Sequence, residues 1–127
     1  MHWVACVGAA GLLKGYKATT HWASLVQLAL LGAEPVSERV VRDQNRITGA
    51  GVTSGIDFAL NVVSEIYGSD IAQNIQLHME YDPAPPFTCG SPRTASEEQL
   101  KKAQEQAAPF IEKRRQATLR AAARLQK

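Results

Sequence analysis

The sequence predicts an α/β domain, in which helices pack on an open sheet of short strands. The main observation is the stretch Arg46–Gly68, which has the pattern of a strand, a glycine turn and a helix. A second strand-then-helix pattern covers Lys17–Leu31. In open α/β sheets, ligands bind just beyond the carboxyl ends of the strands. We therefore expect the functional edge at Gly49–Val52, within a single domain, 1–127, whose length suffices for its own core.

The helix after Gly51 is the most strongly indicated element. Thr53 or Ser54 can cap its start, Asp57 lies in the first turn where the helix dipole favours a carboxylate, and Gly68 can end it. Its apolar residues are spread over more than one face, which predicts that it is covered on more than one side. These residues are Val52, Ile56, Phe58, Ala59, Leu60, Val62, Val63, Ile66 and Tyr67.

Five elements are predicted before this helix. Met1–Leu13 is almost entirely apolar and indicates a helix buried on all sides, with Cys6 buried and inert inside it. Lys17–His21 is predicted to be a strand and Trp22–Leu31 a helix, from which the chain can return as a parallel strand. Val36–Thr48 indicates two short strands joined by a polar turn at Gln44-Asn45.

Two helices are predicted after Gly68. Ser69 can cap a helix over Asp70–Tyr81, and the proline-rich segment from Asp82 stops it. An extended loop leads to Pro92, and Ser96 with Gln99 forms a capping box for a final helix in the extension 94–127. Pro109 either kinks this helix or starts a second one.

Composition excludes several classes of function. No apolar run is long enough to span a membrane, Met1–Leu13 lacks the features of a signal peptide, and we expect a soluble cytoplasmic protein. Two isolated cysteines give no metal site and no disulfide framework, and we expect no cofactor. Residues 109–127 hold six basic residues and one acidic one, but no recognition motif accompanies them, so nucleic-acid binding is not expected.

Several motifs resemble the ThiJ/PfpI branch of the class I glutamine amidotransferase-like superfamily, and its isonitrile hydratases in particular. They cover nearly the whole chain and end in an arginine-rich tail. The motifs are Gly-Ala-Ala-Gly-Leu-Leu from Gly8, Ala-Thr-Thr-His-Trp from Ala18, Glu-Arg-Val-Val-Arg-Asp from Glu38, Thr-Gly-Ala-Gly-Val-Thr-Ser-Gly from Thr48, Glu-Tyr-Asp-Pro-Ala-Pro-Pro-Phe from Glu80 and Gly-Ser-Pro from Gly90.

The resemblance implies part of a flavodoxin-like, doubly wound sheet, with this chain as its C-terminal half and a long C-terminal helix. Members carry a nucleophilic cysteine on a strand-to-helix elbow, seven residues before Gly8, a position that Met1 occupies here. The catalytic residues are therefore expected to be absent. A truncated gene, an internal start or a mis-called gene model would each explain this.

The residues expected to line the pocket come from two motifs. The first supplies Thr20, His21 and Trp22, and the second supplies Gly49, Ala50, Gly51 and Val52. The resemblance places His21 near the family cysteine, although His21 can equally be a hydrogen-bonded structural residue. Cys89 lies in a loop where the family needs no cysteine, and the Gly-x-Thr-x-Gly pattern around Thr53 is a weak match to a nucleophile elbow.

Two functions remain open at this point. The first is hydration of an isonitrile to an N-substituted formamide, with this chain inactive as it stands. The alternative is a non-enzymatic, dimerising or ligand-sensing module like those of AraC-type regulators. In either case, uncovered apolar surface predicts a homodimer or larger aggregate, with the stripe Phe110, Ala117, Ala121 and Leu125 as one contact.

Overall fold

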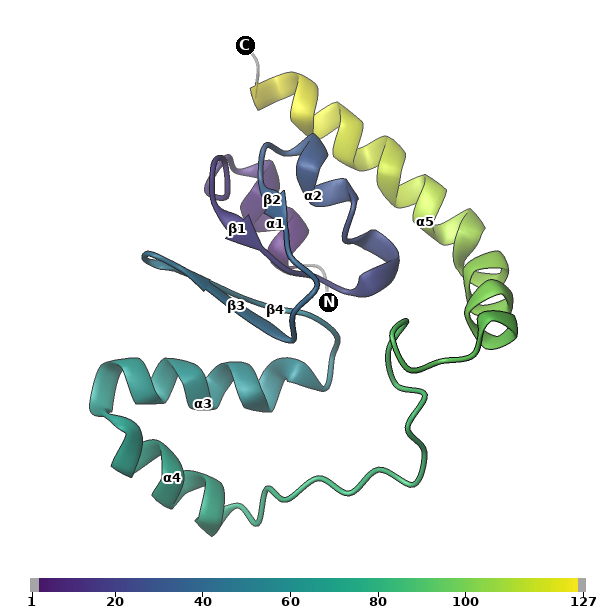
Figure 1. Cartoon of the computed structure of the whole chain (residues 1–127). Helices are drawn as coiled ribbons and strands as arrows, with labels where there is room; N and C mark the ends of the chain where they lie inside the picture. The colour runs from purple at the N-terminus through teal and green to yellow at the C-terminus, as the bar shows by residue number, and fades with distance from the viewer. Residues whose placement is uncertain (1–2, 126–127) are drawn as a thin grey trace.

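The computed structural model describes residues 3–125, so the prediction that concerns Met1 lies outside the described residues. The elements follow one another in the order of Figure 1. They are α1 (Trp3–Ala9), β1 (Lys17–Ala18), the 3₁₀ helix η1 (Trp22–Ser24), α2 (Gln27–Leu30), β2 (Glu34–Pro35), β3 (Val40–Asp43), β4 (Arg46–Gly49), α3 (Ser54–Tyr67), α4 (Ser69–His78) and α5 (Glu97–Leu125).

The strands lie between two groups of helices. Figure 1 shows α1, α2 and α5 on one side of the strands and α3 and α4 on the other. An α/β fold with a long C-terminal helix is thus confirmed. The strands form two short pairs, one parallel (β1 with β2) and one antiparallel (β3 with β4).

The two strand pairs are joined through Thr19. Its backbone N–H donates to Thr48 Oγ1 at 2.9 Å, and its hydroxyl donates to the Glu38 carbonyl at 2.8 Å. At Thr19 these bonds to a side chain and from a side chain take the place of backbone hydrogen bonds between strands. Strand β1 therefore ends at Ala18 and not at His21 as predicted. Val36 was predicted to lie in the first strand of the hairpin. Its N–H instead donates to the Ala18 carbonyl, which places Val36 beside β1. The predicted hairpin is correct, and Gln44 adopts a φ of 52° in its turn.

The helix boundaries match the predictions better than the caps do. Helix α3 begins at Ser54, but Thr53 makes no capping bond and the Ser54 hydroxyl donates back to the Gly51 carbonyl. Ser69 is the first residue of α4, not its cap. Gly68 ends α3 with a φ of 89°, a conformation that favours glycine. The helix expected over Trp22–Leu31 is divided into η1 and α2. Its first turn is a 3₁₀ turn, in which the N–H groups of Ser24 and Leu25 donate to the carbonyls of His21 and Trp22.

The capping box at the start of α5 is confirmed. The Gln99 N–H donates to Ser96 Oγ at 3.2 Å and the Ser96 N–H donates to Gln99 Oε1 at 3.1 Å. Pro109 lies inside a single continuous helix, so the restart alternative is wrong. The two ends of the apolar stripe predicted for dimer contact differ. Leu125 lies against Gly11 of the same chain, since a Cβ on Gly11 would be 3.3 Å from Leu125 Cδ2. Phe110, at the other end, is exposed.

The core is small and lies on the α5 side of the strands. Its fully buried members are Leu13, Ala18, Leu28 and Ala33. Helix α1 reaches it closely at Gly8, where a Cβ would lie 2.8 Å from Leu31 Cδ1. The opposite face of α1 is open and Cys6 is exposed, so the prediction that α1 is buried on all sides is wrong. Helix α3 is covered on more than one side, as predicted, because the hairpin and α4 both pack on it, although several of its apolar residues remain exposed. These are Ile56, Ile66 and Tyr67, and Val52 is exposed in the turn before the helix.

Candidate functional site

A cavity of about 400 Å³ lies beyond the ends of β1 and β4, where an α/β fold places its ligands. Four segments build it: the residues after β1, the segment before β3, the turn from β4 into α3, and the loop before α5. Its lining residues are Thr19, Thr20, His21, Trp22, Leu25, Ser37, Glu38, Arg39, Ala50, Gly51, Val52, Thr53, Gly90, Ser91, Pro92 and Arg93.

The predicted pocket residues are brought together by this arrangement. All of them except Gly49 line the cavity. Gly49 lines an adjoining cavity of about 540 Å³, which shares Thr20 and Ala50–Val52 with the first and is walled by the apolar side chains of Val4, Val7 and Phe58 among others. A Cβ at Gly49 would lie 3.0 Å from Ser54 Oγ and 3.6 Å from Phe58, so this wall has little room for a larger residue.

His21 is held by its own turn. Its Nδ1 accepts a hydrogen bond from the Ala23 N–H at 3.3 Å, and its ring lies 5.3 Å from the Trp22 ring at 33°. Burial lowers the pKa of His21 below 6.5, and the positive charge of Arg114 lowers it further. Since Nδ1 is an acceptor, neutral His21 carries its proton on Nε2.

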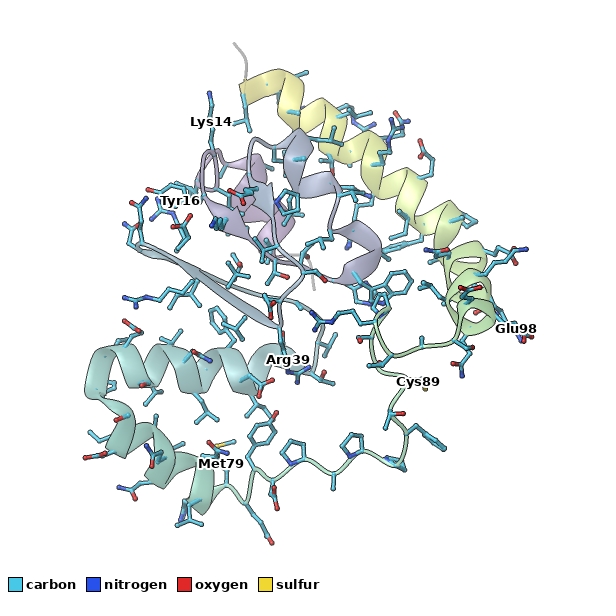
Figure 2. The ribbon with its side chains drawn as sticks, in the orientation of Figure 1. Lys14, Tyr16, Arg39, Met79, Cys89 and Glu98 are labelled. Carbon is cyan, nitrogen blue, oxygen red and sulfur yellow. The ribbon has the colours of Figure 1, made fainter. Side chains whose placement is uncertain are left out.

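Arg39 is the centre of a polar network at the floor of the cavity. Its Nε donates to the Asp57 carboxylate and its Nη2 donates to the Thr53 carbonyl at 2.7 Å. The Tyr81 hydroxyl donates to the other Asp57 oxygen at 2.9 Å. The bond to Asp57 is the main reason that the pKa of Arg39 is raised. Figure 2 shows Arg39 where the hairpin meets the start of α3.

A second arginine attaches the loop before α5 to the cavity. Arg93 Nη1 donates to the Ser37 carbonyl at 3.1 Å, across 56 positions in sequence. Sequence reasoning did not assign Ser37, Glu38, Arg39, Ser91 or Arg93 to the pocket. The available signal was the pair of motifs that begin at Glu38 and Gly90, whose place in the fold depends on tertiary contacts.

The two cysteines are not part of either cavity wall. Cys6 is exposed on α1 and Cys89 is exposed in the extended segment before α5, as Figure 2 shows for Cys89. Among residues 3–125, no group of three or more His, Cys, Asp or Glu side chains is placed to hold a metal ion. None of the helices in the described part of the chain is long and apolar enough to span a membrane.

Comparisons with known proteins agree on one family. Residues 4–65 match the DJ-1/PfpI family. An isonitrile hydratase from Pseudomonas putida is 55% identical over 119 residues, which are 94% of this chain and 52% of the relative. The crystal structure of a ThiJ/PfpI family protein from Pseudomonas syringae superimposes with a TM-score of 0.86 at 48% identity, over 95% of this chain and 48% of that one. The chain thus spans about half the length of the relatives it matches.

Proposed function

Because residues 4–65 of this chain belong to the DJ-1/PfpI family, we propose that the chain supplies one wall of an isonitrile hydratase-type pocket. Such an enzyme adds water to an isocyanide and releases an N-substituted formamide. The observation that carries the proposal is the 55% identity to an isonitrile hydratase over 94% of the chain. The paired cavities fit this substrate class, since one has an apolar wall for the hydrocarbon substituent and the other presents His21.

The nucleophile is the part of the chemistry that the described residues do not supply. The terminal carbon of an isonitrile needs a soft nucleophile, and a thiolate is well suited to this task. Neither Cys6 nor Cys89 lines either of the two cavities. We therefore propose that this chain alone does not hydrate isonitriles, and that the thiol comes from the half of such an enzyme that this chain does not match.

The experiment is complementation of the two halves. The half of the Pseudomonas putida enzyme that this chain does not match is co-expressed with this chain, and co-elution of the two polypeptides is checked first. Formation of the formamide from an aliphatic isocyanide is then followed, with each half alone and a complex whose elbow cysteine is replaced by serine as controls. We expect turnover from the intact complex only. A co-eluting complex with an intact cysteine and no turnover would contradict the proposed reaction.

The exposed apolar side chains favour a second role, that of a dimerising module without catalysis. Ile66, Tyr67 and Leu77 are exposed on α3 and α4, and a soluble monomer rarely leaves many such groups uncovered. We propose that the chain associates into dimers or larger species through this face. A monodisperse monomer by light scattering at micromolar concentrations would contradict this role.

A further inference from the structure

Buried polar contacts join the segment 21–27 to α5, although about 90 residues separate them in sequence. Arg114 Nη1 donates to Ser24 Oγ at 2.9 Å, and the Thr118 hydroxyl donates to Gln27 Oε1 at 3.2 Å. Gln27 Nε2 donates to the Ile111 carbonyl at 3.3 Å. Ser24, Gln27 and Thr118 are all buried. Helix α5 therefore fixes the turn that carries His21.

The charge of Arg114 is not balanced by an ion pair within residues 3–125. Its guanidinium lies over the Phe110 ring, 5.1 Å from the ring centroid. Its Nη2 is buried and has no hydrogen-bond partner in the described part of the chain. A partly buried cation without a carboxylate partner exerts its field on the groups beside it, because low local polarity screens it weakly.

His21 is the titratable group that this field reaches. His21 Nδ1 accepts a hydrogen bond from the Ala23 N–H. A proton on Nδ1 would replace this bond by a contact between two donors, so the backbone also disfavours the protonated imidazole. The other charged groups around the cavity are Glu38, Arg39 and Arg93. Arg39 pairs with Asp57. Burial is the larger reason that the pKa of His21 is lowered, and the positive charge of Arg114 adds to it.

We infer that Arg114 is a positioning residue of the pocket, which holds the His21 turn on α5 through Ser24, so that neutral His21 presents its Nε2–H to the cavity. In this state His21 serves as a hydrogen-bond donor and not as a general base. A donor at this place fits a ligand atom that accepts a hydrogen bond. If the proposed function holds, that atom is the carbonyl oxygen of the formamide, because an amide oxygen accepts hydrogen bonds.

The test is a ¹⁵N–¹H NMR titration of the imidazole of His21 in the full chain, assigned by its loss in His21→Gln. We expect the wild type to show the Nε2–H tautomer and a pKa below 6.5. Arg114→Met should raise the pKa of His21 toward 6.5, and Arg114→Lys should keep it low because the charge is retained. The matched control is Arg115→Met, since Arg115 is exposed and pairs with Glu112 on the same helix.

Two results would overturn the inference. One is an Nδ1–H tautomer in the wild type, which needs no variant and so remains decisive even if Arg114→Met does not fold. The other is a folded Arg114→Met chain, with unchanged circular dichroism, in which His21 titrates as in the wild type. Because no isonitrile is used, either result is independent of whether the proposed reaction is correct.

Discussion

The two sides of the strands differ in how completely they are packed. On the α5 side, Leu13 and Leu28 are 1% and 2% exposed, and Gln27 of α2 bonds to both Ile111 and Thr118 of α5. On the α3–α4 side, Ile66 is 64% exposed and Leu77 is 81% exposed. The free energy of burial scales with the apolar area removed from water, so the α5 side carries most of the stability. The pocket lies between a well-packed side and an open one.

This difference indicates which part of the site is preorganised. His21 is attached to the packed side through Ser24 and Arg114, so its position is fixed in the chain by itself. The adjoining apolar cavity has walls from both sides, since Val4 and Val7 lie on α1 and Phe58 lies on α3. The hydrogen-bonding half of the pocket is therefore fixed by the packed side, whereas the apolar half depends in part on the open side.

The largest expected effect comes from the packed core. Leu28→Ala removes a side chain that is 2% exposed and leaves a cavity, which should lower the free energy of unfolding by about 2–5 kcal/mol. Urea denaturation followed by circular dichroism measures this change. Leu77→Ala is the matched control on the open side and should cost much less than 1 kcal/mol. Equal losses for the two variants would show that the sides do not differ.

Association should depend on the open side. Ile66→Lys places a charge where an apolar side chain is available for contact, and it should weaken self-association by roughly 1.5–3 kcal/mol, or about tenfold or more. Sedimentation equilibrium measures the dissociation constant. Val26→Lys, at an exposed position near α2, should leave it nearly unchanged. If only Val26→Lys weakened association, the contact would lie on the packed side.

The polar contacts of α5 should contribute less than its apolar neighbours. Thr118→Val removes the donor to Gln27 Oε1 and leaves that buried oxygen unpaired, at a cost of about 1–3 kcal/mol. Thermal or urea unfolding detects the loss. Gln116→Ala, which removes an exposed bond to Glu112 on the same helix, should stay within about 0.5 kcal/mol of the wild type. A neutral Thr118→Val would mean that α5 is held by apolar contacts alone.

The smallest expected effect is a pH dependence from His21. Its folded-state pKa lies below the unfolded value of 6.5, so the unfolded chain binds the proton more readily. The stabilisation is complete above pH 6.5 and is lost as the pH falls through the folded pKa. His21→Gln should remove this part of the slope, whereas His78→Gln should retain it. A free energy of unfolding that increases as the pH falls below 6.5 would contradict this prediction.

Local signals predicted local structure well. The turn at Gln44-Asn45, the end of α3 at Gly68 and the Ser96–Gln99 capping box each depend on residues a few positions apart. The exposure of Cys6 was not predicted, because the apolar run around it shows only that α1 has a buried face and not how many neighbours cover it. Arg39 and Arg93 were missed at the cavity for a related reason: their partners lie 18 and 56 positions away.

The contrast between a packed side and an open side is tested most directly by hydrogen exchange of the full chain, resolved by peptide mass spectrometry. We expect slow exchange in the peptides that contain Leu28, Thr19 and the α5 residues around Thr118, with opening free energies close to that of global unfolding. The α4 peptides should exchange much faster, because few buried contacts hold that helix. Equal protection of α4 and α5 would show that the chain is packed evenly, and that His21 is not fixed by a better-ordered side.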